Sequence, residues 1–160
     1  MSERKYTHCE SDENLFSLHD CVAKSAYFRD GVFGFELEDG FWVLTDHPDN
    51  STNEVVRTDF SKIEFALEDG EDYDFRIYVL SKNIFGQMVC KEWTVNEFLD
   101  KINNGKYWLE FVYEYSRYNS KIFECDLRSS KKPYRKECIL KISLTHINYY
   151  WNNLREDRTW

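Results

Sequence analysis

The residues best suited to chemistry in this sequence are three neighbours, His19, Asp20 and Cys21. A cysteine activated by a histidine base, with an acid to orient that base, is a common catalytic nucleophile. Adjacent residues of a strand point to opposite faces, however, and a nucleophile and its base normally come from separate elements. We therefore interpret the three residues as the start of a strand, with Asp20 bonding locally to the backbone. The sequence predicts no catalytic residue, and we expect a protein that is not an enzyme.

Metal and cofactor sites have no matching pattern either. Histidines and cysteines are scattered, without the H-x₃-H or C-x₂-C spacing of zinc sites. His146 continues the apolar alternation of residues 140–144, which favours a partly buried side chain over a metal ligand. The acidic run at 68–74 lacks the alternating ligands of an EF-hand loop, and no glycine-rich phosphate loop occurs. We expect no metal and no cofactor.

A basic segment at 128–136 could hold phosphate groups. Its five cations are Arg128, Lys131, Lys132, Arg135 and Lys136. The whole chain nevertheless carries a net charge of −8, which repels nucleic acid. We expect no nucleic-acid partner, and the segment has two open roles, solubility or intramolecular ion pairing.

The charge of the chain is divided unevenly along its length. Residues 1–75 hold 19 acidic and 6 basic side chains, whereas residues 76–160 hold 10 acidic and 15 basic ones. The acids of the first part cluster at expected turns, which are exposed. We predict that they form a binding surface for a basic protein, made of Asp30, Glu38, Asp39, Glu68, Asp69, Glu71, Asp72 and Asp74. The alternative is that they keep a β-rich protein soluble and block association between sheet edges.

The elements that carry these residues are predicted to be mostly strands. With 160 residues, 18% of them aromatic, the chain fits one β-rich domain at 15–152, with polar tails at 1–14 and 153–160. Asp30-Gly31 predicts a tight hairpin turn, residues 32–37 and 41–44 predict a meander, and 68–74 predicts another hairpin tip. We expect an α+β fold, with about nine mainly antiparallel strands in a sandwich or curled sheet.

One helix is predicted at 94–103. Thr94 can cap its first turn, with Glu97 three residues later as in a capping box. Val95, Phe98, Leu99 and Ile102 recur on one helical face, and Gly105 follows its end.

The sequence also predicts a cytoplasmic protein. No apolar run approaches the length of a membrane helix, and the N-terminal residues lack the apolar core of a signal peptide. The five cysteines are odd in number and widely spaced, which is typical of reduced thiols.

Three stretches carry a family resemblance: Leu18-His19-Asp20-Cys21, Asp39-Gly40-Phe41-Trp42 and Trp93-Thr94-Val95-Asn96-Glu97-Phe98. Together with the acidic, aromatic-rich character of the chain, they resemble the immunity proteins of bacterial polymorphic and contact-dependent toxin systems. The resemblance implies an inhibitor that binds a cognate toxin domain, often a basic nuclease, and neutralises it by occlusion. It assigns no individual residue.

A second hypothesis is a small-ligand-binding β protein or an unrecognised enzyme with an aromatic-lined pocket. It is based on the tryptophans Trp42, Trp93, Trp108 and Trp151, for which ordinary core packing is the alternative.

Overall fold

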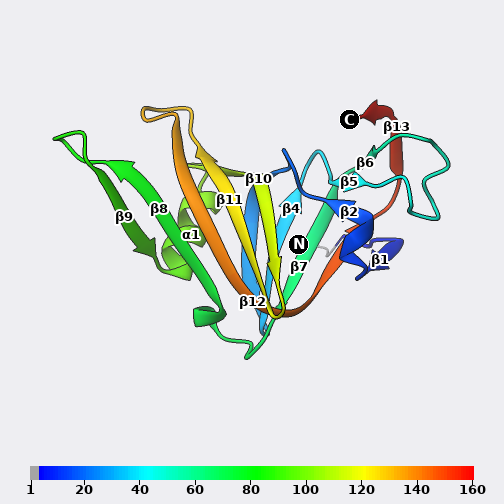
Figure 1. Cartoon of the computed structure of the whole chain (residues 1–160), viewed down its shortest axis with the longest axis horizontal. Helices are drawn as coiled ribbons and strands as arrows, with labels where there is room; N and C mark the ends of the chain where they lie inside the picture. The colour runs from blue at the N-terminus through cyan, green and yellow to red at the C-terminus, as the bar shows by residue number, and fades with distance from the viewer. Residues whose placement is uncertain (1–3) are drawn as a thin grey trace.

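The computed structural model of the chain describes residues 4–160 as a strongly curved antiparallel sheet, one helix and a second, smaller sheet (Figure 1). The nine strands of the large sheet are β1 (His8–Glu10), β3 (Val22–Arg29), β4 (Val32–Leu37), β7 (Ser61–Leu67), β8 (Phe75–Lys82), β9 (Met88–Trp93), β10 (Trp108–Arg117), β11 (Ser120–Arg128) and β12 (Arg135–Trp151). The small sheet contains β2 (Phe16–Ser17), β5 (Trp42–Val43), β6 (Val56–Thr58) and β13 (Leu154–Thr159). The predicted α+β, β-rich class is confirmed, with the curled sheet as its form.

Six strands close into a barrel-like ring. In order around the ring they are β3, β4, β7, β12, β11 and β10, and every neighbouring pair is antiparallel. The ring closes where β10 pairs with β3 over only two residues, Leu109 with Ala23 and Glu110 with Val22. Beyond these two pairs, the residues that precede β3 lie along β10, where the Asp20 N–H donates to the Phe111 carbonyl at 2.8 Å.

The 17-residue strand β12 organises the rest of the sheet. Its first part pairs with β8 along one edge and with β11 along the other. Its second part pairs with β7 along the same edge as β8. Strands β7 and β8 therefore follow one another along β12, with Leu67 opposite Leu144 and Phe75 opposite Ile142. The prediction of a hairpin at 68–74 was wrong, because this segment connects two strands that do not pair with each other.

Two further local predictions differ from the structure. Strand β4 pairs with β7 and not with residues 41–44, so the predicted meander does not form. Residues 42–43 form β5, which belongs to the small sheet. A bulge between Leu144 and His146 shifts the alternation of β12, so that His146 is exposed and Ile147 is buried. An extra residue in one strand reverses the face of every later side chain, which the sequence pattern alone does not reveal.

Helix α1 (Val95–Asn103) packs against β3 and β8 and confirms the predicted helix. Thr94 Oγ1 accepts the Glu97 N–H at 3.1 Å, and Val95, Phe98 and Ile102 are buried. Glu97 pairs with Lys101 instead of completing the capping box. Phe98 contacts the rings of Phe33 and Phe75, which stack with centroids 3.6 Å apart. Within residues 4–160, no helix combines the length and the apolar character that crossing a membrane requires.

Both expected tails contain strands. Strand β1 pairs with residues 149–151 of β12, and β13 pairs with β6. The segments expected as polar tails, 1–14 and 153–160, therefore include paired strands, since backbone hydrogen bonds hold a strand without needing apolar side chains. Residues 1–3 of the expected N-terminal tail lie outside the described residues.

A polar cluster joins three strands on the outside of the ring. The Glu64 carboxylate of β7 accepts the Tyr27 hydroxyl of β3 and the Lys62 ammonium group, the latter at 2.8 Å, and it also bonds to Tyr150 of β12. Burial raises the pKa of Glu64, but the hydrogen bonds from Lys62, Tyr27 and Tyr150 outweigh burial and lower it overall.

This lowered pKa predicts a pH-dependent effect of Glu64→Gln. A carboxyl whose pKa is lower in the folded state stabilises the fold above its unfolded pKa of about 4.3, and this contribution is lost as the pH falls through the folded value. We expect Glu64→Gln to lower the free energy of unfolding by about 1–2 kcal/mol at pH 7. The difference from wild type should shrink below pH 4, as measured by urea denaturation across pH. A difference of constant size would show that Glu64 does not act through its charge.

Candidate functional site

One end of the ring gathers part of the predicted acidic surface. The 30–31 turn meets the 68–74 connection through two glycines, and a Cβ on Gly31 would lie only 3.0 Å from the Gly70 Cα. The Leu67 N–H also donates to the Gly31 carbonyl at 3.0 Å. We call this region the acidic end, which comprises Asp30, Glu68, Asp69, Glu71, Asp72 and Tyr73.

The carboxylates of the acidic end are exposed and largely uncompensated. Glu68 accepts a hydrogen bond from Asn119 at 3.1 Å, and Asp69 accepts one from the Tyr73 hydroxyl at 3.0 Å. Only Asp30 has a cationic partner among the described residues, Arg29 at 3.8 Å. The hydrogen bond to Asp69 raises the pKa of Tyr73, so the phenol stays neutral beside these charges.

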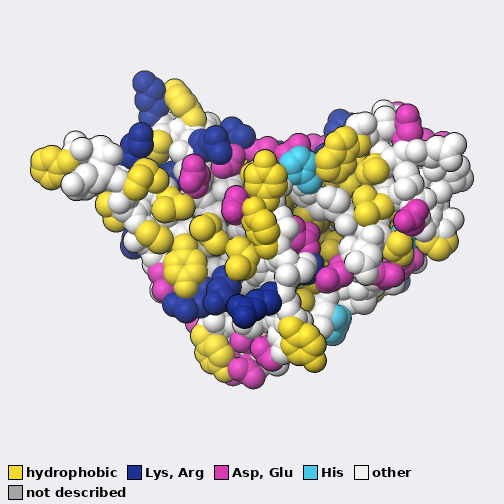
Figure 2. Space-filling view, viewed as in Figure 1, with side chains coloured by type: hydrophobic (Ala, Val, Ile, Leu, Met, Phe, Trp, Pro, Cys, Tyr) yellow, Lys and Arg dark blue, Asp and Glu magenta, His cyan; other side chains and the backbone are white. Residues whose placement is uncertain are grey.

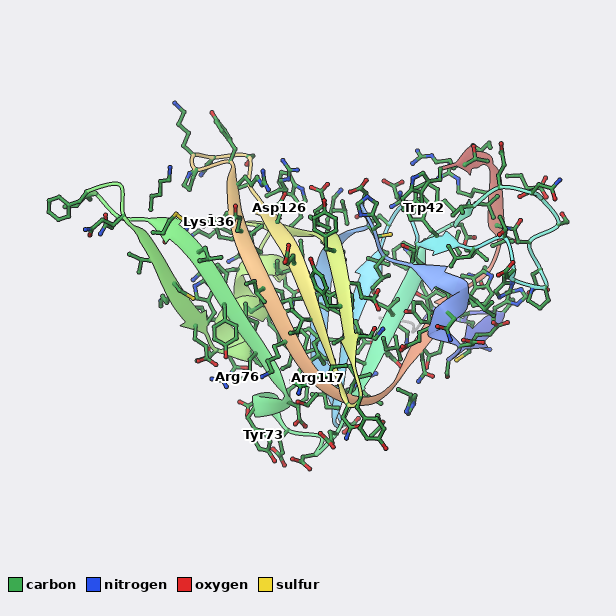
Figure 3. All side chains as sticks on the ribbon, viewed as in Figure 1. Trp42, Tyr73, Arg76, Arg117, Asp126 and Lys136 are labelled. Carbon is green, nitrogen blue, oxygen red and sulfur yellow. The ribbon has the colours of Figure 1, made fainter. Side chains whose placement is uncertain are left out.

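Two tyrosines stand on this end. Tyr73 is 61% exposed, and Tyr118 is 99% exposed in the β10–β11 turn, next to the Asn119 that bonds to Glu68. Figure 2 shows hydrophobic and acidic side chains together at the lower tip of the molecule, and Figure 3 places Tyr73 there. Tyrosines at the centre of a charged surface are typical anchors of protein interfaces.

Three of the eight predicted residues are not part of this exposed surface. Asp74 is buried, and its carboxylate accepts the Asp69 and Glu71 N–H groups at 2.8 and 3.4 Å, so it shapes the 68–74 connection from inside. Glu38 and Asp39 lie beyond the other end of β4, about 20 Å away at the usual rise per residue.

At that other end, the charges are matched within the molecule. Lys24 pairs with Glu38 at 2.9 Å, and Arg158 pairs with Asp39 at 3.6 Å. The eight acids therefore do not form one surface, and five of them remain candidates for partner binding. A basic band containing Arg76 and Arg117 borders the acidic end on the adjoining sheet face (Figures 2 and 3).

Of the neighbours His19, Asp20 and Cys21, the histidine and the cysteine do not form a catalytic dyad. The Cys21 thiol is fully buried and directed at the Ser17 and His19 carbonyls, and burial raises its pKa to about 12, so it is not a thiolate at neutral pH. His19 Nδ1 lies 2.6 Å from the Val112 carbonyl, to which it can only donate.

One group of possible metal ligands, Glu10, His47 and Asp49, lies within 4.8 Å. His47 Nδ1 accepts the Asp49 N–H at 3.0 Å, so its proton is on Nε2, which faces Glu10 at 2.9 Å. Metal binding at Nε2 would move this proton to Nδ1, against the Asp49 N–H. The group instead ties β1 to the 46–53 loop.

A buried lysine lies in a cleft that the sequence analysis missed. Lys121 bonds to Glu114, to Ser116 at 2.7 Å and to Glu13 at 3.0 Å, and it is only 5% exposed. A cavity of about 350 Å³ lies beside it, and a second cavity of about 190 Å³ is lined by Leu18, His19, Phe111, Tyr113 and Phe123, among others. The available signal was alternation, since Lys121 shares the inward positions of Phe123, Cys125 and Leu127 on β11.

The four tryptophans of the pocket hypothesis are spread through the fold. Trp93 and Trp151 are buried in the core, whereas Trp42 donates its indole N–H to the His19 carbonyl at 2.8 Å and lies under Arg57. None of the four lines either the cavity beside Lys121 or the smaller one beside Glu114.

Comparison with known proteins adds no assignment. No family model, curated protein or solved structure matches this chain significantly.

Proposed function

We propose that this protein is a protein-binding inhibitor of immunity type, which receives a basic partner, such as the catalytic domain of a cognate toxin, at its acidic end. The observation that supports this proposal is the set of exposed carboxylates Glu68, Asp69, Glu71 and Asp72, none ion-paired to a described residue, between the exposed rings of Tyr73 and Tyr118. Solubility alone gives no reason for placing tyrosines among these charges.

In this proposal the charges and the rings have different tasks. Clustered carboxylates raise the rate of encounter with a cationic surface, and this effect weakens as salt screens the charges. The tyrosine rings bury apolar area in the complex and slow its dissociation. Inhibition follows by occlusion, because the six-stranded ring of this protein then covers the face of the partner that the acidic end contacts.

The acidic end is also held in a fixed shape before binding. Asp74 fixes the 68–74 connection through two backbone N–H groups, and the Gly31–Gly70 contact leaves no room for a side chain between the two turns. A surface that is ordered beforehand loses less conformational entropy on binding, which favours affinity.

The test is association with the product of the neighbouring upstream gene, measured by surface plasmon resonance at low and high salt. Replacing Asp69, Glu71 and Asp72 with Asn, Gln and Asn should slow association at low salt about tenfold and flatten its salt dependence. The matched control replaces the exposed acids Asp46, Glu54 and Asp100 in the same way, and should keep the wild-type rate.

Two results would contradict the proposal. Absence of a complex at low ionic strength, where steering is strongest, excludes this partner and with it the immunity function. A complex whose association rate is the same for the triple variant and the wild type places the interface elsewhere.

A second candidate function is small-ligand binding or catalysis in the cleft beside Lys121. The observation that favours it is a buried ion pair next to two cavities, one of them lined by aromatic rings. A panel of small metabolites screened by thermal shift tests this candidate. A compound that stabilises the wild type but not Tyr113→Ala would support it.

A further inference from the structure

A groove of about 510 Å³ opens between the β8–β9 and β11–β12 hairpins. It lies far from the acidic end, since β8 begins beside that end and finishes at the groove (Figure 1). Leu80, Met88 and Pro133 give the groove an apolar lining, while Lys82, Arg135 and Lys136 add positive charge. Glu137 is the single carboxylate among its lining residues.

The groove exists because two paired strands separate. The register of β8 with β12 ends at Leu80 opposite Glu137. Beyond this pair, β8 continues with β9 as far as Lys82 opposite Met88, and β12 continues with β11 as far as Arg135 opposite Arg128. The two hairpins then diverge, so that the backbone edges of β8 and β12 face each other across the groove (Figure 1). Past this last pair, Ser81–Lys82 of β8 and Arg135–Lys136 of β12 are paired on one side only among the described residues, so each edge offers a short stretch of backbone to an added strand.

The positive charge of the groove is available to a ligand. Arg135 is held by the buried carboxylate of Asp126 at 2.7 Å, so its charge is partly matched. Lys82 and Lys136 form no ion pair with any described residue, and Lys136 lies 5.7 Å from the Tyr107 ring centroid. Figure 3 shows Lys136 on β12 near Asp126. Lys131 and Lys132 add two more exposed cations in the β11–β12 turn.

We infer that this groove binds an extended acidic segment of a partner protein. The segment's backbone bonds to the open edge of β8 or β12, its apolar side chains contact Leu80, Met88 and Pro133, and its carboxylates meet Lys82 and Lys136. Lys82 shares the sheet face of Leu80 and Met88, whereas Lys136 lies on the opposite face, near the Tyr107 ring. A strand that carries acidic and apolar side chains on both of its faces therefore satisfies all three features. A nucleic acid would match the lysines but leave the apolar lining uncovered. This inference is independent of the proposed function, which concerns a basic partner at the acidic end.

A synthetic peptide tests the inference directly. The probe is a fluorescein-labelled ten-residue peptide in which pairs of Asp or Glu alternate with pairs of Leu or Val, so that both faces of the strand carry acids. Its binding to the full chain is followed by fluorescence anisotropy. We expect saturable binding, which the variant Lys82→Glu/Lys136→Glu weakens about tenfold or more. The control variant Lys106→Glu/Lys141→Glu makes the same charge change at exposed lysines outside the groove and should bind as wild type does.

A second probe separates strand pairing from simple charge attraction. The same peptide with alternate backbone amides N-methylated keeps every charge but loses half of its backbone donors. We expect it to bind about tenfold more weakly, because the short open edges of β8 and β12 can bond to only one or two of the lost donors. Equal binding of the two probes, or equal losses in the groove and control variants, overturns the inference. So does self-association of the protein that disappears in Lys82→Glu/Lys136→Glu, because the groove would then hold a second copy of this chain.

Discussion

We expect Phe75→Ala to lower the free energy of unfolding by about 4 kcal/mol, the largest loss from any single substitution considered for this fold. Phe75 is 2% exposed at the start of β8, where its ring stacks on Phe33 of β4 and contacts Phe98 of α1. Removal of the Phe75 side chain leaves a cavity where the six-stranded ring, helix α1 and strand β8 meet. Stacked rings cannot close that space without moving whole elements, so the cavity persists.

Urea denaturation followed by tryptophan fluorescence measures this loss. Phe85→Ala is the matched control, because Phe85 is 80% exposed in the β8–β9 turn and should change stability by less than about 0.5 kcal/mol. A loss below about 2 kcal/mol for Phe75→Ala would mean that the site collapses around the missing ring, and that this junction is not closely packed.

The second large effect concerns Lys121. We expect Lys121→Met to lower the free energy of unfolding by about 3 kcal/mol, because the Glu13 and Glu114 carboxylates would then face each other without their shared cation. Both carboxylates keep partial contact with water, at 37% and 30% exposure of their side chains, which places the loss at the lower end of the range for buried pairs.

A compensating substitution identifies the cause of that loss. The double variant Lys121→Met/Glu114→Gln should recover part of the stability that Lys121→Met loses. Lys106→Met, at an exposed lysine, should be neutral. A cost that is the same with and without the Glu114 carboxylate would show that Lys121 stabilises the fold through packing of its aliphatic stem.

Residue type and spacing were enough to predict much of the local structure. Aromatic and apolar alternation predicted strands such as β4, where Phe33 and Phe35 are both buried. Thr94, the apolar face of 95–102 and Gly105 predicted the helix with an error of one residue at its start. These features depend on neighbours within a few positions, and short-range geometry is what residue type and spacing encode.

Which distant segments meet could not be predicted and is known from the fold. The sequence placed eight acids at turns, but the pairing of β7 and β8 along one edge of β12 buries Asp74 and separates Glu38 and Asp39 from the rest. The sequence also left the role of 128–136 open, and the structure divides it between Arg135, which pairs with Asp126, and Lys136, which lines a groove.

The physical reason is that strand pairing is not local. The backbone hydrogen bonds of a sheet are the same for every residue type, so the order of strands depends on the summed packing of the whole core, above all the rings of Phe33, Phe75 and Phe98. Single bulges, such as the one between Leu144 and His146, then decide which face each later side chain takes.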